Sequence, residues 1–278
     1  MYRYEIPWKT QEMLDKLKKN DATLTSLTFY DKEICVDGLK KLGAVLRCNF
    51  HLKRLSIRSI ISRTSFGIEG ATAGDEVATA IGEALKFNTT LMELKFWNTE
   101  IGNAGAIALG FALQRNNALT ILELFNNNIR DQGATALGMA LQHNTTLTLL
   151  NLGANNIGDE GATALGVALQ YNTTLTNLNL EINNIGDLGA AALVVAQRGR
   201  ITWVHIDLDK NKFGPGSEIM ASDMAEQHWL PCLHVGFPQS CHKIIMATLL
   251  CNRSMGNYPV LPDYVWHLIF SFWQRKNL

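Results

Sequence analysis

The densest group of potentially reactive side chains in this sequence lies close to its C-terminus. Three histidines and three cysteines occur there within a short stretch: His228, Cys232, His234, Cys241, His242 and Cys251. Imidazole and thiolate are the ligands that zinc prefers in proteins. The paired Cys-x-x-Cys spacing of structural zinc sites is missing, so we interpret this 228–251 cluster as ordinary thiols and histidines and expect no metal.

Sequence motifs of common enzyme active sites are also missing. The chain contains no Gly-x-Ser-x-Gly turn, no Gly-x-x-x-x-Gly-Lys loop and no His-Glu-x-x-His helix. These motifs present a nucleophile, cradle phosphate groups and hold a catalytic zinc ion, respectively. No Ser/His/Asp or Cys/His set stands out in the rest of the chain. We therefore expect a non-enzymatic protein that needs no cofactor.

The middle of the chain repeats itself with a period of 28 residues. Seven units of this kind begin, in order, at Leu24, Leu52, Leu91, Leu119, Leu147, Leu175 and Trp203. The second unit is longer than the others, because about eleven extra residues lie near positions 58–70. Such a period is typical of a solenoid, in which each unit buries its apolar side only by stacking on its neighbours. Solenoids mostly present a long surface to a partner.

Each unit combines two periodicities. The opening Leu-x-x-Leu-x-Leu alternates apolar and other residues, which predicts a short strand. A segment such as GDEGATALGVALQ then has apolar residues three and four positions apart, which predicts a helix. Repetition of strand, turn, helix and return predicts an α/β fold: a horseshoe-shaped solenoid with a parallel sheet on the concave side and helices outside. The small helix residues should let each helix lie close against the strand layer.

The repeated pattern LxxLxLxxNxIgxxGaxaLaxaLxxNttL resembles the ribonuclease-inhibitor-like class of leucine-rich repeats, over residues 23–214. The resemblance implies a structural role for the asparagine that follows each strand, whose side chain would satisfy backbone groups in the bend and form a ladder. In this chain these residues are Asn127, Asn155, Asn183 and Asn211. The earlier units depart from the pattern and carry other residues at this place: Lys32, Ile60 and Thr99.

Three regions follow from this pattern. Residues 1–22 are expected to form a helical cap, in which Thr10 is the N-cap of the helix QEMLDKLKK and Leu14 and Leu17 point inward. This cap would cover the open edge of the first strand. Residues 23–214 form the seven repeats, and residues 215–278 form a helical C-terminal segment that either caps the solenoid or carries an interaction of its own.

Composition limits the possible partners. The chain has 25 basic and 25 acidic residues, so it carries no bulk charge that would attract nucleic acid or an anionic membrane. No apolar run is long enough to cross a bilayer, and the N-terminal residues are unlike a signal peptide. Five unpatterned cysteines favour a reducing compartment, and we expect a cytoplasmic protein. Three Asn-Thr-Thr sequons, at Asn88, Asn144 and Asn172, are explained by the repeat register and not by glycosylation.

Between the leucines of each strand, alternate residues should point toward whatever the concave surface holds. Tyr30, Trp97 and Phe125 share one position in the repeat, and exposed rings are typical of protein-binding hot spots. The same surface changes from basic in the second repeat to acidic in the last, which is suited to steering a charged partner. The candidate partner-binding residues are Tyr30, Arg58, Lys95, Trp97, Glu123, Phe125, Glu181, Asp207 and Asp209.

An alternative interpretation keeps these rings inside the protein. They would then pack on one another, or under the inserted 60–70 segment, and bind nothing. If they instead hold a partner, replacing Trp97 or Phe125 by alanine should weaken binding without changing the melting temperature. Strong destabilisation would assign the rings to the core.

The C-terminal segment carries a second resemblance. Its string LPDYVWHLIFSFW is similar to F-box-like or SOCS-box-like tails, in which a Leu-Pro pair begins a helix; the matching residues are Leu261, Pro262, Val265, Leu268, Ile269 and Phe272. Such a tail implies recruitment of a ubiquitin ligase adaptor by an amphipathic helix. Repeats of this class joined to such a tail also resemble effectors that amoeba-infecting intracellular bacteria deliver into host cells. That resemblance would place the protein in the host cytosol.

The sequence therefore predicts binding of a protein partner on the concave surface, with the partner's identity open. Recruitment of a ubiquitin ligase through the tail is one alternative. The same repeat class includes activators of the Ran GTPase, so a GTPase-activating role is another. Ribonuclease inhibition is a third, although inhibitors of that class are rich in cysteine throughout their repeats and this chain is not.

Overall fold

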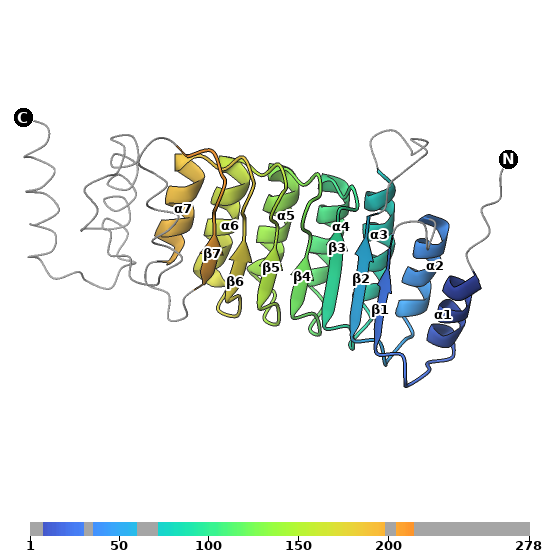
Figure 1. Ribbon diagram of the computed structural model, residues 1–278. Helices are drawn as coiled ribbons and strands as arrows, with labels where there is room; N and C mark the ends of the chain where they lie inside the picture. Colours follow the sequence, from blue (N-terminus) through green and yellow to red (C-terminus); the bar gives the residue numbers. More distant parts are fainter. Residues whose placement is uncertain (1–7, 31–35, 60–71, 198–203, 214–278) are drawn as a thin grey trace, which may run out of the picture.

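A computed structural model describes residues 8–30, 36–59, 72–197 and 204–213 of the chain (Figure 1). Strands and helices alternate along these residues, as the repeat pattern predicts. The elements are α1 (Trp8–Lys18), β1 (Ser26–Phe29), α2 (Val36–Leu46), β2 (Arg54–Arg58), α3 (Ala73–Leu85), β3 (Glu93–Trp97), α4 (Asn103–Leu113), β4 (Ile121–Glu123), α5 (Asp131–Leu141), β5 (Leu149–Asn151), α6 (Asp159–Tyr171), β6 (Asn177–Asn179), α7 (Asp187–Gln197) and β7 (His205–Asp207).

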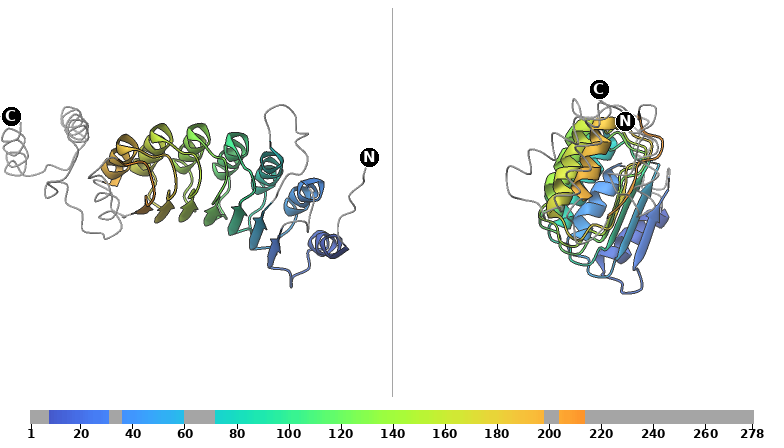
Figure 2. Two further views of the ribbon diagram at one scale, coloured as in Figure 1. Left: turned by 45° about the horizontal axis from the view of Figure 1, so that its top comes forward. Right: turned by 90° about the vertical axis from the view of Figure 1, so that its left-hand side faces the viewer.

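The strands form one parallel sheet in which their spatial order is their order in the sequence, from β1 to β7. Equivalent leucines of successive repeats face each other across the sheet: Leu27 pairs with Leu55, and Leu55 pairs with Leu94. The helices form a second layer on one side of the sheet and leave its other side open (Figure 1). Figure 2 shows the two layers bent into an arc, with strands inside and helices outside. The predicted α/β solenoid is confirmed.

Apolar residues between the two layers form one continuous core. Strand leucines such as Leu122 and Leu150 have no exposed surface, and helix residues such as Leu137 and Leu165 are buried against them. A unit has nothing to cover its sides except the next unit, so this core runs the length of the solenoid. The apolar residues that recur in each repeat of the sequence are therefore the residues that are buried in the structure.

Glycines let adjacent helices approach each other closely. A Cβ atom at Gly138 of α5 would lie 3.1 Å from the carbonyl oxygen of Ala164 in α6, and one at Gly166 would lie 3.0 Å from that of Ala192 in α7. The expectation that small residues serve helix–strand contact was therefore incomplete, because these glycines lie against the next helix. Because the neighbouring backbones are packed this closely, a side chain there would require the next helix to shift.

The asparagine ladder predicted from the resemblance is present. The side-chain oxygen of Asn155 accepts a hydrogen bond from the backbone N–H of Ile129 at 3.0 Å, while its amide donates to the carbonyls of Leu124 and Leu152 at 2.9 and 3.0 Å. Asn127, Asn183 and Asn211 make equivalent bonds. Buried backbone groups in a tight bend need such partners.

A second ladder explains the Asn-Thr-Thr sequons. The oxygen of Asn144 accepts from the N–H of Leu147 at 2.8 Å, and its amide donates to the carbonyls of Leu113 and Asn116 at 2.8 and 3.0 Å. Asn88, Asn116 and Asn172 do the same in their own repeats. These side chains are 2–4% exposed, so the folded protein buries the atoms to which a sugar would be attached.

A third set of contacts, which the sequence reasoning missed, caps α4, α5, α6 and α7 from the repeat before each of them. Oδ1 of Asp131, the first residue of α5, accepts from the N–H groups of Gly158 and Gly161 at 2.7 and 3.0 Å, at the start of α6. Asp159 caps α7, Asp75 caps α4 and the uncharged Asn103 caps α5 in the same way. The carboxylates satisfy otherwise unpaired N–H groups and lie at the positive end of the helix dipole.

The N-terminal helix differs in detail from its prediction. It begins at Trp8, so Thr10 lies within α1 and is not its N-cap. Leu14 and Leu17 are buried as expected, at 2% and 1% exposure. In Figure 1, α1 lies next to α2 at the N-terminal end of the solenoid. The predicted insertion and the 215–278 segment fall outside the described residues, except for positions 58 and 59.

Candidate protein-binding surface on the open face of the sheet

The open face of the sheet carries rows of side chains, to which each repeat contributes one residue. The middle row consists of Thr28, Ser56, Lys95, Glu123, Asn151, Asn179 and Asp207, which the strand register aligns directly. The row two positions later, where the strands end, consists of Tyr30, Arg58, Trp97, Phe125, Gly153, Glu181 and Asp209. Every predicted partner-binding residue lies in one of these two rows, because alternate strand residues share a face.

Arg58 interacts with aromatic rings on both of its neighbouring repeats. Its guanidinium carbon lies 4.1 Å from the centroid of the Trp97 ring and 5.8 Å from that of Tyr30. The cation is attracted by the negative faces of the rings, and the rings in turn restrict where the guanidinium can go. The sequence reasoning had treated this arginine as one charge of a gradient; the structure makes it part of an aromatic assembly.

Trp97 is held from its other side by the fourth repeat. Its ring meets that of Phe125 edge to face, with centroids 6.4 Å apart and planes inclined at 63°. Its Nε1–H donates a hydrogen bond of 2.8 Å to Oε2 of Glu123. Both rings are half-buried, and Tyr30 is 53% exposed. We refer to Tyr30, Arg58, Trp97, Glu123 and Phe125 as the aromatic–arginine cluster.

The contact between the rings agrees with part of the alternative interpretation, and the binding of a partner by the rings stays a prediction. Trp97 and Phe125 do pack on one another, as the alternative proposed, yet they keep solvent-accessible surface on the open face of the sheet. Gly153 follows Phe125 in the row, and a Cβ atom there would lie 3.1 Å from the Phe125 ring and 2.8 Å from Oδ1 of Asn179. A side chain at this position would therefore displace the Phe125 ring or the side chain of Asn179.

The charges at the centre of the face neutralise one another. Lys95 Nζ lies 2.8 Å from Oε1 of Glu123 and 3.9 Å from Oε2 of Glu93. One oxygen of Glu123 thus pairs with Lys95 while the other accepts from Trp97. Because Lys95 and Glu123 neutralise each other, they add little net charge to the surface. Their main contribution is to hold the Trp97 ring in place.

Uncompensated charge remains at the two ends of the described sheet. Arg54 and Arg58 lie on β2, and no carboxylate forms an ion pair with either of them among the residues that the structure describes. Glu181, Asp207 and Asp209 lie at the other end, where the N–H of Asp209 donates to Oδ1 of Asp207 at 3.0 Å. The predicted gradient thus survives as a basic end and an acidic end, separated by neutral repeats.

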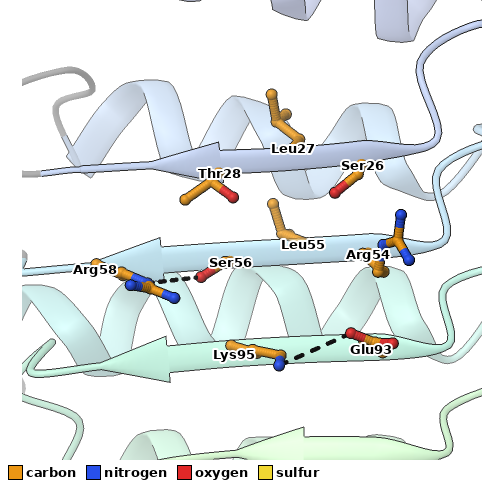
Figure 3. A pocket seen from close by; sticks show the side chains of 9 residues that line it. All are labelled: Ser26, Leu27, Thr28, Arg54, Leu55, Ser56, Arg58, Glu93 and Lys95. Carbon is orange, nitrogen blue, oxygen red and sulfur yellow. Dashed lines mark hydrogen bonds and ion pairs between the residues drawn. The ribbon is translucent and has the colours of Figure 1, made fainter.

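A shallow depression of about 180 Å³ lies over β1–β3 at the basic end (Figure 3). Its floor between the strands carries the hydroxyl groups of Ser26, Thr28 and Ser56, and Arg54 and Arg58 lie at its opposite ends. Sequence reasoning singled out Arg58 among these residues but did not identify the depression. Only the spacing Arg-x-x-x-Arg, which places both side chains on one face of a strand, would have indicated it.

Ile182 is a further feature that the sequence did not reveal. It lies directly after the second row, has a φ of 52° and is 40% exposed. The equivalent residues Asn98 and Asn126 have φ values of 54°, in the left-handed region that asparagine tolerates. A β-branched residue is strained in this conformation.

Several sequence predictions fall outside the described residues. They are the 228–251 histidine–cysteine cluster and the tail residues Leu261, Pro262, Val265, Leu268, Ile269 and Phe272. Within the part of the chain that is described, no group of three histidine, cysteine, aspartate or glutamate side chains is arranged to hold a metal ion. The helices in that part are all too short or too polar to cross a membrane.

Two solved structures resemble the chain at low sequence identity. The structure titled "Leiomodin-1 Actin-Binding Site 2 (ABS2)" has 16% identity and a TM-score of 0.37, and the match covers 90% of this chain and 99% of that one. The C-terminal domain of tropomodulin from Caenorhabditis elegans has 11% identity and a TM-score of 0.42, over 67% of this chain and 90% of that one. No curated protein matches the sequence.

A family description matches the repeats themselves. Four segments match the family "Leucine Rich repeat": residues 87–110, 115–138, 143–166 and 171–194. Each segment covers one strand, from β3 to β6, the loop after it and the larger part of the helix that follows, from α4 to α7. Four consecutive repeats of the solenoid therefore match leucine-rich repeats, as the sequence pattern predicts.

Proposed function

We propose that this leucine-rich repeat chain is a non-enzymatic binding module, which holds a protein partner on the open face of its sheet. The observation that carries the proposal is the aromatic–arginine cluster. Half-buried rings fixed by neighbours on both sides offer a large apolar contact at little entropic cost. Arginine and tryptophan are the residue types most enriched at the energetic centres of protein interfaces.

The chemistry of the rest of the face supports the same function. Ile121 and Leu149 extend the apolar surface of the cluster along β4 and β5, and both are half-buried in the absence of a partner. Charges of opposite sign flank this apolar centre. A partner with an acidic group near β2 and a basic group near β7 would be oriented on the surface before it makes close contact.

Affinity capture from a cell lysate tests this proposal. The intact chain is compared with the double variant Trp97→Ala/Phe125→Ala, and bound proteins are identified by mass spectrometry. We expect one or more partners to be captured by the intact chain and lost with the variant, because truncation of hot-spot residues weakens binding by at least tenfold.

A matched control lies on the helix side of the molecule. Phe111 and Met139 are both 58% exposed, on α4 and α5. The variant Phe111→Ala/Met139→Ala removes a similar apolar area from the opposite surface and should retain the partner. The proposal fails if the control variant loses the partner while Trp97→Ala/Phe125→Ala keeps it.

Finer assignments remain proposals that rest on sequence. One is that the protein acts in the cytoplasm, or in a host cytosol as a bacterial effector. A second is that its tail recruits a ubiquitin ligase, and a third is that the chain activates a GTPase. Pulldown of a ligase adaptor by the full chain, compared with a Leu268→Asp variant, tests the tail. The GTPase-activating role is tested by measuring GTP hydrolysis by a panel of small GTPases with and without the chain.

A further inference from the structure

The depression over β1–β3 differs from the rest of the open face in its chemistry. The apolar centre of the face begins at Trp97, whereas the depression is lined by hydroxyl groups and by arginines at both ends (Figure 3). Ser56 on its floor is only 9% exposed, and its hydroxyl accepts a hydrogen bond of 3.4 Å from Nε of Arg58. The hydroxyl groups and guanidinium groups together supply many hydrogen-bond donors.

Contacts with neighbouring residues fix the position of the Arg58 guanidinium, which could then bind an anion. The Trp97 and Tyr30 rings lie beside its guanidinium, and its Nε–H donates a hydrogen bond to the hydroxyl oxygen of Ser56. Its terminal nitrogens make no ion pair with a carboxylate in the described ranges. A guanidinium that is already ordered loses less entropy when it binds, and its planar fork matches a carboxylate.

Arg54 supplies a second positive charge at a defined distance. It is exposed and lies four residues before Arg58 on the same strand. Since a strand rises about 3.3 Å per residue, the two backbone positions are about 13 Å apart. A single small anion contacts both guanidinium groups only if the two side chains bend toward each other, whereas an extended peptide spans the distance between the two backbone positions in the same number of residues.

The charge of the depression favours carboxylates over more highly charged groups. Glu93 lines it and lies 3.9 Å from Lys95, whose nearer partner is Glu123. Arg54, Arg58 and Lys95 carry three positive charges and Glu93 and Glu123 two negative ones, so these five residues have a net charge of +1. A low net charge favours singly charged carboxylates, each of which can pair with one arginine, over phosphate groups of higher charge.

We infer that the depression binds an extended acidic segment of the protein partner, in which two carboxylate side chains four residues apart pair with Arg54 and Arg58. The hydroxyl groups of Ser26, Thr28 and Ser56 form hydrogen bonds with the intervening part of the segment. This inference rests on the proposed function and adds the chemical class of the partner's segment and its place on the surface.

Titration of the full chain with short peptides tests the inference. The probe is the capped pentapeptide Glu-Thr-Thr-Thr-Glu, and binding is followed by NMR at the arginine Nε–H groups. We expect shifts at Arg54 and Arg58 that saturate and that weaken as salt is added, because exposed charge pairs are screened. The neutral peptide Gln-Thr-Thr-Thr-Gln and the peptide Glu-Glu-Thr-Thr-Thr, with adjacent carboxylates, should each bind at least fivefold more weakly.

Variants locate the effect. Arg54→Gln and Arg58→Gln should each weaken binding of the probe roughly tenfold, because a charge-assisted pair is lost. Arg54 is exposed and packs on no aromatic ring of the described residues, so we expect its variant to leave the fold intact. Lys53→Gln is the matched control: it removes the same charge from the exposed neighbouring residue, which does not line the depression, and should change the affinity less than twofold.

Several outcomes would overturn the inference. The inference fails if the neutral peptide binds equally well or if the affinity is unchanged in Arg54→Gln. It also fails if an equal concentration of inorganic phosphate displaces the probe, which would indicate a site for an isolated anion. If the arginine variants also retain the captured partner while Trp97→Ala/Phe125→Ala loses it, only the acidic segment is refuted. The protein-binding function would then stand.

Discussion

At the scale of single residues, the same side chains serve stability and recognition. Trp97 donates to Glu123, meets the ring of Phe125 and carries Arg58 on its face. Glu123 in turn pairs with Lys95. A residue with this many neighbours contributes to folding even when it also forms a binding surface.

These contacts change what is expected of Trp97→Ala. Sequence reasoning predicted weaker partner binding with no change of melting temperature. The lost ring contact and hydrogen bond instead predict a free energy of unfolding lower by about 1–3 kcal/mol. Urea denaturation followed by circular dichroism measures this. An unchanged unfolding midpoint would show that the contacts contribute nothing, and a loss above about 5 kcal/mol would assign the ring to the core.

Ile182 provides a second prediction at this scale. Its φ of 52° is unfavourable for a β-branched residue, and its side chain is 40% exposed, so little burial offsets the strain. Ile182→Asn should raise the free energy of unfolding by about 1 kcal/mol, since asparagine tolerates this conformation. The reverse change, Asn126→Ile, should lower it by a similar amount. Thermal unfolding of both variants is the measurement, and a less stable Ile182→Asn protein would contradict the expectation.

At the scale of elements, the starts of α4, α5, α6 and α7 are each hydrogen-bonded to the repeat before them. Asp131 receives two backbone N–H groups at the start of α6, and Asp159 does the same for α7. A helix of 11–13 residues is marginal by itself in water, so its cap and its packing decide whether it forms. The aspartates therefore cap the start of a helix and, by the same hydrogen bonds, join that helix to the preceding repeat.

Asp131→Ala should lower the free energy of unfolding by about 1–2 kcal/mol, because two N–H groups lose their acceptor and the helix dipole loses its counter-charge. Asp131→Asn should cost less than half as much, since Asn103 already caps α5 with an amide oxygen at 2.9 and 3.0 Å. Chemical denaturation of both variants distinguishes the two contributions. Equal losses would mean that the charge of the carboxylate carries most of the effect.

At the scale of the whole molecule, the solenoid places different chemistry on its successive repeats. The first described repeats are polar and basic on the open face, the middle ones are aromatic and apolar, and the last ones are acidic. A compact domain would bring such regions together around one centre. The linear stack keeps them in sequence order along the surface, which suits an extended partner segment.

The local pattern of the sequence was sufficient to predict most of this architecture. A constant period sets the order of the strands, alternation sets which residues face outward, and the asparagine after each strand predicts the ladder at Asn127, Asn155, Asn183 and Asn211. These features are local because each unit repeats the same contacts with its neighbours. The starting residue of α1 was wrong, since helix ends depend on contacts that propensity does not record.

Only the tertiary structure decided which of the outward side chains meet. Arg58 and Trp97 are 39 residues apart in the chain, because the longer second repeat separates them, yet they are partners in the sheet register and their side chains are stacked. Asp131 reaches the helix of the next repeat, and the hydroxyl groups of Ser26 and Ser56 come from different strands. The histidines and cysteines near the C-terminus first suggested chemistry, but the surface that the structure supports is the open face of the sheet. Sequence determined its residues one repeat at a time; their joint geometry arises only when the repeats stack.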